Sequence, residues 1–169
     1  MSVQRLLLDK YDARLKAPFA TLGIIASETH LLHLHFLPMD IVAKAPKTNT
    51  VAHLASVQLM AYLDNPAFVF DLPLKLSGSK HQVDVWQAMR KIAAGDTQTY
   101  GELSAGIDSS PRAVGTACGQ NPVPIVVPCH RVVAATGLGG FMGGKQNDSL
   151  SIKRWLLAHE SKHKEASLF

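Results

Sequence analysis

Residues 124–133 read PIVVPCHRVV and place a thiol, an imidazole and a guanidinium side by side within an apolar run. Pro124 and Pro128 restrict the backbone on both sides of Val126, so the run is no long helix and Cys129 follows a rigid apolar strand or turn. Thiolate is the reactive form of cysteine, and a neighbouring cation or a proton-accepting histidine makes it available near neutral pH. The setting favours Cys129 as a nucleophile, with inert packing of a small buried thiol as the alternative.

The overall composition limits the class of protein. A length of 169 residues allows one or two small domains with a real core. The two cysteines, Cys118 and Cys129, are too few for a disulfide framework or a closed zinc site, and they fit a reducing cytoplasm. The apolar run Leu6–Leu8 is too short for a secretory signal, and no apolar stretch is long enough to cross a bilayer. A net charge of +4 is compatible with a polyanionic partner without identifying one.

The first half of the chain predicts a small sheet and one helix. Apolar strands are expected at Ala20–Ser27 and His30–Leu37, joined by a short polar turn. A helix is expected from about Thr50 to Leu63, with Asn49 or Thr50 as its cap and the Asp-Asn-Pro sequence at 64–66 as its end. The stretch 73–80, which contains Ser-Gly-Ser, is the best candidate for a linker.

Histidines at positions 30, 33 and 35 raise the possibility of a metal site. His33 and His35, however, alternate along the second predicted strand with apolar residues, as the polar face of a half-buried strand does. We therefore expect no metal here.

After the linker the pattern becomes helical with short loops. Val85, Met89 and Ile92 recur at helical spacing, and Gly95 is placed to terminate that helix. Residues 99–102, Thr-Tyr-Gly-Glu, have the form of a capping box and mark the start of a further helix.

A second helix start follows closely at Ser110–Pro111, where a capping serine precedes a proline in the first helical position. Two helices joined by a tight turn at 106–108 predict a helix-turn-helix. Arg112 falls in the first turn of the second helix, where a recognition helix points its side chains. The neighbouring small residues are Ala113, Gly115, Thr116 and Ala117. They suit either a flat surface for nucleic acid or simple packing against the core.

The C-terminal segment predicts an amphipathic helix whose apolar stripe contains Ile152, Trp155, Leu156 and His159. Glu160 follows Leu156 by one turn. A carboxylate on that buried edge needs a histidine or a backbone donor as its partner, because burying it unpaired is costly. The alternative is a glutamate near the helix end that points to solvent.

These segments carry a family resemblance. Residues 121–133, NPVPIVVPCHRVV, resemble the active-site signature of the methylated-DNA–protein-cysteine methyltransferases, the 6-O-alkylguanine-DNA alkyltransferases. The segments TYGEL (99–103), RAVG (112–115) and WLLAHE (155–160) are further matches in the right order. The resemblance spans most of residues 81–160, and the N-terminal part resembles the family only in its strand-and-helix pattern. It implies an α+β fold. Residues 1–76 would form a ribonuclease-H-like small sheet with a helix, and residues 77–169 a winged helix-turn-helix-like domain that binds DNA and carries the cysteine.

The resemblance also implies a catalytic set. Cys129 would accept the alkyl group by direct displacement, and His130 would take the thiol proton through a water. Glu160 would hold that imidazole in position, as the third member of a triad does. Asn121 would bind the tight turn around the cysteine, whereas Arg131 would make structural hydrogen bonds.

A second implied set binds the substrate: Tyr100, Arg112, Ala113, Gly115, Val132, Phe141 and Met142. The target base lies inside a duplex and would have to be flipped out to reach a buried thiol. Arg112 would enter the stack in its place, and Tyr100 would donate its hydroxyl to the base. The helix-turn-helix would approach through the minor groove, which suits the small residues beside Arg112.

The implied activity is direct-reversal DNA repair, in which Cys129 irreversibly takes the alkyl group of 6-O-alkylguanine, with 4-O-alkylthymine as a second lesion. The partner would be double-stranded DNA containing alkylated bases, bound by a monomer, and cooperative assembly on DNA is left open. No cofactor is implied, because the alkyl group comes from DNA and ends on the protein. Animal members can carry an N-terminal zinc site with cysteine ligands. No cysteine precedes Cys118 in this chain, so we expect no metal.

Three departures from the animal relatives bear on the range of lesions. The turn between Tyr100 and Arg112 is about two residues shorter. Phe141 and Met142 stand where those relatives place tyrosine and serine around the base pocket, and Met142 cannot donate a side-chain hydrogen bond. The connection Lys145–Ser151 to the last helix is longer.

The same residues allow three alternatives to alkyl transfer. A non-catalytic module that binds alkylated DNA lesions exists among the relatives, but those proteins replace the acceptor cysteine. A cysteine hydrolase needs an oxyanion hole and a water route to a thioester, and neither signature is visible. A redox-sensing thiol requires exposure, whereas the valines around Cys129 predict burial.

Overall fold

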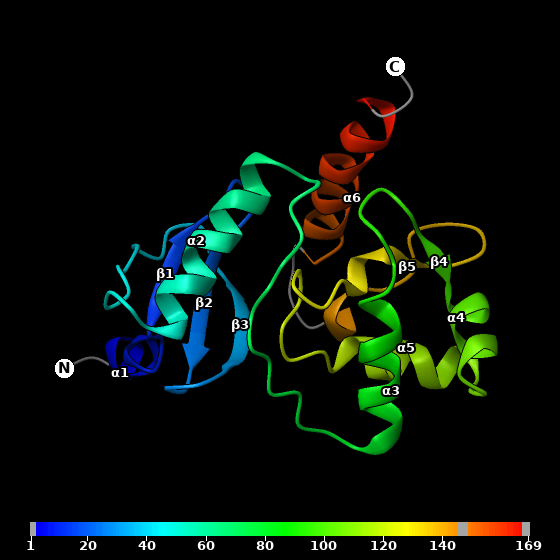
Figure 1. Ribbon diagram of the computed structural model, residues 1–169, viewed down its shortest axis with the longest axis horizontal. Coiled ribbons are helices and arrows are strands. Elements are labelled where there is room, and N and C mark those ends of the chain that lie inside the picture. Colours follow the sequence, from blue (N-terminus) through cyan, green and yellow to red (C-terminus); the bar gives the residue numbers. More distant parts are fainter. Residues whose placement is uncertain (1–2, 145–148, 167–169) are drawn as a thin grey trace. The chain divides into compact units, whose positions relative to one another are not determined.

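The computed structural model describes residues 3–144 and 149–166, with side chains through residue 162. The chain forms two compact units, Met1–Leu76 and Ser77–Phe169 (Figure 1). The predicted α+β class is confirmed, because the first unit holds a small antiparallel sheet and the second is mainly helical. Residues 145–148 of the connection expected to be long lie outside the described residues.

The N-terminal unit is a three-stranded antiparallel sheet against which one helix packs. The strands follow the order β1 (Ala13–Lys16), β2 (Thr21–Ala26) and β3 (Leu31–Leu37), so both predicted strands are confirmed. Two further elements, β1 and the short helix α1 (Val3–Asp9), were not predicted. β1 is a short edge strand with two basic side chains, and edge strands of this kind lack a run of apolar residues.

The histidines of β3 belong to the sheet surface. His33 is exposed, and the half-buried His35 ring lies 2.8 Å through Nδ1 from the hydroxyl of Tyr11. Among the described residues, no group of three or more histidine, cysteine or acidic side chains is arranged to hold a metal ion.

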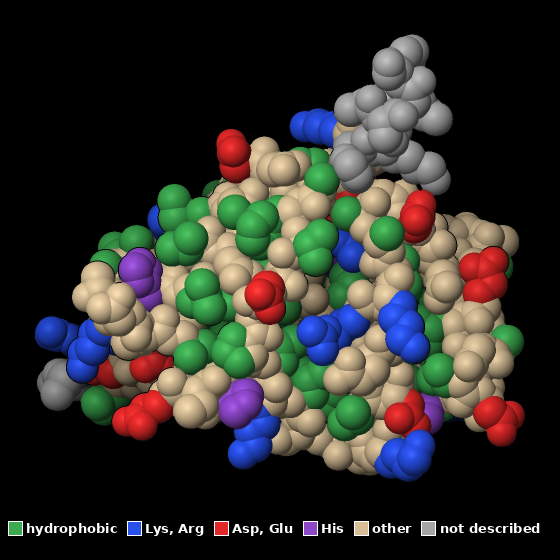
Figure 2. Space-filling model, in the orientation of Figure 1, with side chains coloured by type: hydrophobic (Ala, Val, Ile, Leu, Met, Phe, Trp, Pro, Cys, Tyr) green, Lys and Arg blue, Asp and Glu red, His purple; other side chains and the backbone are tan. Residues whose placement is uncertain are grey.

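Helix α2 (Val51–Asp64) packs on the sheet and agrees with the predicted helix. The hydroxyl of Thr50 caps it by accepting a hydrogen bond from the backbone amide of His53 at 3.1 Å. The side chains that face the sheet and are fully buried are Ala55, Leu59 and Tyr62. The outer face is also apolar and leaves Leu54, Val57 and Met60 exposed, as the hydrophobic side chains over α2 in Figure 2 show.

The C-terminal unit contains four α-helices, two very short strands and two 3-10 turns in the described part of the chain. The helices are α3 (Lys80–Met89), α4 (Tyr100–Gly106), α5 (Pro111–Gly119) and α6 (Ser149–Ala166). The parallel strands are β4 (Gln98–Thr99) and β5 (Val132–Val133), and the turns are η1 (Cys129–Arg131) and η2 (Met142–Gly144). Within the described ranges, no helix has both the length and the apolarity needed to cross a bilayer.

Helices α4 and α5 form the predicted helix-turn-helix and pack against each other. At the start of α4, the Glu102 amide donates to Thr99 Oγ1 at 3.1 Å, and the Thr99 amide donates to the Glu102 carboxylate at 3.0 Å. Ser110 caps α5 by accepting from the amide of Ala113 at 3.2 Å. Both predicted caps are therefore confirmed.

The prediction that Gly95 terminates the helix before it is wrong. Helix α3 ends at Met89, and Gly95 lies in a later turn with a φ of 88°. The amide of Ile92 bonds to the Met89 carbonyl three residues back, so the chain tightens and leaves the α-helix there. Ile92 is nevertheless buried, so its apolar spacing reflects burial and not continuation of the helix.

Candidate active site

The turn that leads to Cys129 is held by one asparagine. Asn121 Nδ2 donates to the Val127 carbonyl at 2.7 Å, and Asn121 Oδ1 accepts from the Val123 amide at 3.0 Å. Inside the turn Ile125 has a φ of 73°, a left-handed conformation that a β-branched residue adopts only when its surroundings impose it. The predicted rigid turn is present, and the side chain of Asn121 fastens it from inside.

Cys129 begins the 3-10 turn η1 and is 3% exposed, so the predicted burial of its thiol is confirmed. Its Sγ lies 3.9 Å from Met142 Sδ. A small cavity of about 90 Å³ opens beside the thiol. Five of the residues expected to form the site line this cavity together: Tyr100, Gly115, Cys129, Phe141 and Met142.

Burial raises the pKa of the Cys129 thiol to about 11. A hydrogen bond with Asn121 and the positive charge of Lys153 act in the opposite direction but do not outweigh the burial. The neighbouring groups therefore do not keep Cys129 ionised in the resting protein. If this thiol is to act as a nucleophile near neutral pH, a neighbouring group must accept its proton.

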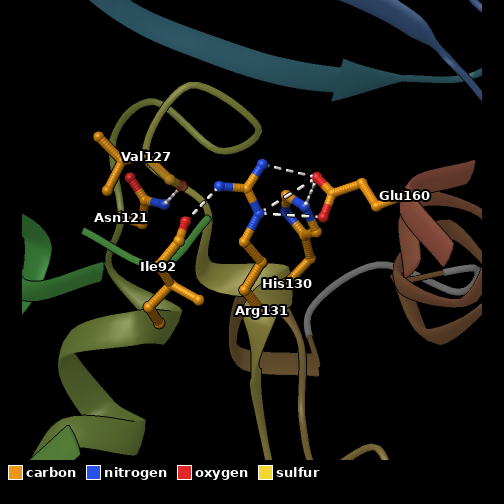
Figure 3. A network of polar contacts seen from close by, with 6 residues as sticks. All are labelled: Ile92, Asn121, Val127, His130, Arg131 and Glu160. Atoms are coloured by element: carbon orange, nitrogen blue, oxygen red, sulfur yellow. Dashed lines mark hydrogen bonds and ion pairs between the residues drawn. The ribbon is translucent and has the colours of Figure 1, made fainter. Parts of the chain in front are cut away.

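The histidine that follows Cys129 in the chain belongs to a buried polar network. His130 is fully buried, and its Nε2 lies 2.7 Å from Glu160 Oε1 on helix α6 (Figure 3). Arg131 donates to the same carboxylate from Nε, at 3.0 Å and 3.2 Å, and from Nη2 at 2.8 Å. Glu160 is 1% exposed and points inward, so the alternative of a glutamate in solvent is wrong.

The charges of this network follow from its contacts. Burial alone would raise the pKa of Glu160, but the hydrogen bonds and charges of His130 and Arg131 lower it to about 2. An ionised Glu160 can only accept, so Nε2 of His130 carries the hydrogen. Burial lowers the pKa of His130 despite the contact with Glu160, so the imidazole is neutral near pH 7. Its other nitrogen, Nδ1, is buried without a hydrogen-bond partner among the described residues and can accept a proton.

One important residue was not found from the sequence. Lys153 is fully buried in α6, and its Nζ donates to the carbonyls of Val132 at 2.7 Å and Gly140 at 2.8 Å. Its charge favours the thiolate of Cys129, and burial lowers its own pKa. A signal was available, because Lys153 lies one position after Ile152 and seven before Glu160, on the buried side of the predicted helix.

Tyr100 closes one side of the cavity. Its hydroxyl donates to the Gly140 carbonyl at 3.4 Å, and burial raises its pKa, so the phenol keeps its proton. Gly139 has a φ of 73°, and a Cβ there would lie 2.7 Å from the Tyr100 ring, so only glycine fits. Val132, which was also expected in the site, is buried in β5 and reaches the site through its carbonyl bond with Lys153.

The remaining predicted residues lie on the recognition helix. Arg112 is exposed in the first turn of α5, and Ala113 beside it is half-buried. Gly115, on the next turn, faces the ring of Tyr100 at 3.9 Å from where its Cβ would be. Helix α5 therefore connects an exposed basic residue at its start with the cavity that contains Cys129.

A helix-turn-helix beside a buried thiol is typical of a DNA-binding domain that carries a reactive cysteine, and comparison with known families identifies residues 80–162 as a DNA-binding domain. Residues 80–162 match the family model of the DNA-binding domain of 6-O-methylguanine DNA methyltransferase. A methylated-DNA–protein-cysteine methyltransferase of Mycolicibacterium paratuberculosis is 46% identical over 114 residues, 66% of each chain. One of Methanosarcina mazei is 37% identical over 86% of this chain and 94% of its own.

Solved structures give the same result. A Mycobacterium tuberculosis O6-methylguanine methyltransferase has a TM-score of 0.75 at 32% identity, covering 88% of this chain and 91% of its own. The protein from that organism called OGT, in complex with DNA, also has a TM-score of 0.75, at 33% identity, covering 88% and 92%. The chain therefore belongs to the methylated-DNA–protein-cysteine methyltransferases, the family to which the sequence resemblance pointed, and is a DNA-binding methyltransferase of DNA repair.

Proposed function

We propose that this protein repairs 6-O-alkylguanine in duplex DNA by moving the alkyl group to Cys129 in one displacement. The observation that carries the proposal is a buried thiol beside a neutral histidine whose Nδ1 is free to accept a proton among the described residues. Sulfur would form a bond to the alkyl carbon while the bond from that carbon to guanine oxygen breaks. The electron pair would leave with the guanine.

The proton follows a separate route. His130 takes it from the thiol through a water, and Glu160 holds the imidazolium that results. Asn121 keeps the turn around the sulfur in place, and its hydrogen bond with Cys129 favours the thiolate. Tyr100, a protonated phenol at the cavity, donates a hydrogen bond to the base as negative charge develops on it.

Access to the thiol requires base flipping, because a base that is still stacked in a duplex cannot reach a cysteine that is only 3% exposed. Arg112, exposed at the start of α5, enters the stack in place of the extruded nucleotide. The small residues Ala113 and Gly115 allow α5 to lie in the minor groove. Phe141 and Met142 then contact the flipped base, since both line the cavity.

The thioether product is chemically stable, so each molecule acts once and needs no cofactor. Alkylated thymine is a second candidate lesion, because its 4-O-alkyl group presents the same kind of carbon to the sulfur. The working form is a monomer on double-stranded DNA.

A transfer assay tests the proposal. The protein is incubated with duplex DNA carrying a labelled methyl group on guanine oxygen, and label on the protein is counted. We expect one methyl per molecule, located on Cys129 by mass spectrometry. Multiple turnovers would indicate a hydrolase, and DNA binding without transfer would indicate a non-catalytic lesion-binding module.

Two variants separate chemistry from binding. Cys129→Ser should lose transfer and keep most DNA affinity, because phosphate contacts dominate that affinity. Arg112→Ala should slow transfer in duplex DNA more than in single strands, where no stack has to be filled. Arg90, an exposed arginine at the end of α3, provides the matched control. Arg90→Ala should change neither the DNA affinity nor the relative rates of transfer in duplex and single-stranded DNA. Equal slowing of Arg112→Ala in both substrates would remove the stacking role.

A further inference from the structure

The carboxylate of Glu160 is shared between two neighbouring residues. Its Oε1 lies 2.7 Å from His130 Nε2 and 2.8 Å from Arg131 Nη2, and Arg131 Nε reaches both oxygens. All three residues are buried, and Arg131 is the most exposed of them at 9%.

Arg131 is fixed on its other side as well. Its Nη1 donates to the carbonyl of Ile92 at 2.5 Å, just beyond the end of α3 (Figure 3). The guanidinium is planar, so anchoring one end and pairing the other sets the plane of the Glu160 carboxylate. The orientation of that carboxylate in turn fixes the ring of His130.

We infer that Arg131 is a positioning residue that weakens the hold of Glu160 on a proton at His130, so that the imidazole stays neutral until the thiol gives up its proton. A carboxylate paired with His130 alone would stabilise the imidazolium more strongly, so the neutral, proton-accepting form of His130 would be less favoured. A carboxylate already paired with a guanidinium stabilises it less. This inference rests on the proposed role of His130 as the base.

The other charges around His130 can be named. Burial lowers the pKa of His130, Glu160 raises it, and the charges of Arg131 and Lys153 lower it. Glu160 and Lys153 come from α6, and Arg131 from η1. Changing Arg131 alone leaves the contributions of Lys153 and of burial in place. A shift in the pKa of His130 then measures the effect of the Arg131 guanidinium.

The competing explanation is a purely structural tie between η1, α6 and the end of α3. Such a tie would lower the amount of folded protein, and it would slow transfer by one factor at every pH. The positioning role instead predicts a change in the shape of the pH profile.

The experiment uses the full-length chain with Arg131→Met and Arg131→Lys, and Arg90→Met as the control. Transfer of a labelled methyl from duplex DNA is measured in single turnovers from pH 5 to 8. In Arg131→Met the midpoint of the acidic limb should move up by about one pH unit, a tenfold gain in proton affinity. Arg131→Lys, which keeps the charge without the fork, should move it by less, and Arg90→Met should not move it.

A second measurement does not depend on transfer. The ring nitrogens of His130, observed by NMR in protein labelled at histidine, should titrate at higher pH in Arg131→Met, or in Arg131→Lys if the methionine variant does not fold. An unchanged titration in the folded variant overturns the inference. If the wild type transfers no methyl at any pH, the proposed function fails, and the NMR titration still decides the role of Arg131.

Discussion

The two units of the molecule differ in the polar side chains that they bury. In the described part of the N-terminal unit, the buried polar side chains are the uncharged Thr21, Ser56 and Gln58, and no charged side chain is buried. The described part of the C-terminal unit buries the ionisable side chains His130, Arg131, Lys153, His159 and Glu160, and it also buries both cysteines. The first unit is built as an ordinary apolar core, and the second holds groups whose burial is costly.

This difference between the units indicates which residues serve stability and which serve the reaction. Burying ionised groups costs several kcal/mol each unless they are paired, and apolar replacements of similar volume are often as stable. A set of such groups around one thiol is therefore a sign of reaction chemistry more than of folding. Changes in the N-terminal unit should alter stability alone, whereas changes in the charged network should alter stability and alkyl transfer together.

The largest effect is expected for Glu160→Gln. The neutral amide leaves Arg131 buried without its anion, which should lower the free energy of unfolding by about 3–5 kcal/mol. It also removes the group that holds His130, and transfer by the folded fraction should slow by about 100-fold. Chemical unfolding and single-turnover transfer measure the two effects. Glu102→Gln, at the exposed capping box of α4, is the control and should lose little of either.

Leu59→Ala tests the expectation that changes in the N-terminal unit alter stability alone. Leu59 is fully buried between α2 and the sheet, so its truncation should cost about 2–5 kcal/mol. Because the cavity lined by Cys129 consists of residues from the C-terminal unit, the rate of transfer per folded molecule should stay unchanged. A slower rate in protein shown to be folded would mean that the two units are coupled during the reaction.

The sequence predicted the regular parts of both units well, because their signals are local. The caps at Thr99 and Ser110 depend on residues within one turn, and both are present. The partner of Glu160 was also predictable, since a carboxylate on an apolar stripe must be paired if it is buried. The edge strand β1 and the end of α3 were missed or misplaced because tertiary contacts, and not local pattern, decide them.

Prediction of the site from the sequence was limited in the same way. The family signature located Cys129 and His130, yet the raised pKa of the thiol depends on burial that residue order does not give. Lys153 was missed because a lysine on a helix is usually solvated, and its carbonyl partners come from distant loops. The sharing of one carboxylate by adjacent residues likewise exists only once α6 lies against η1.

Acid should destabilise the C-terminal unit first. The pKa of Glu160 falls from 4.5 to about 2 on folding, so its contribution is complete above pH 4.5 and is lost as the pH falls toward 2. This contribution is about 3 kcal/mol. His130, with a pKa lowered from 6.5, adds to the loss, because below pH 6.5 the unfolded chain takes up that proton first. Hydrogen exchange between pH 7 and 3 should show protection lost around η1 and α6 before β2 and β3. Simultaneous loss of protection in both units would contradict the expectation that the C-terminal unit is the more sensitive to acid.

The smallest effect is expected for Lys153→Met. The substitution removes the buried cation that favours the thiolate of Cys129, so the pKa of the thiol should rise further and transfer near pH 7 should slow by about tenfold. The deficit should shrink as the pH approaches the pKa of the thiol, because the thiolate then forms without help. Lys91→Met, at an exposed position, is the matched control and should behave as the wild type.

A deficit of Lys153→Met that stays constant with pH would mean that the lysine only ties the carbonyls of Val132 and Gly140 together. In that case its burial would be a matter of loop structure, and the charged groups of the C-terminal unit would divide into a network that acts on the proton and a cation that acts on the fold. A deficit that fades at high pH would place Lys153 with His130 and Glu160, as one set of charges that all act on the same sulfur.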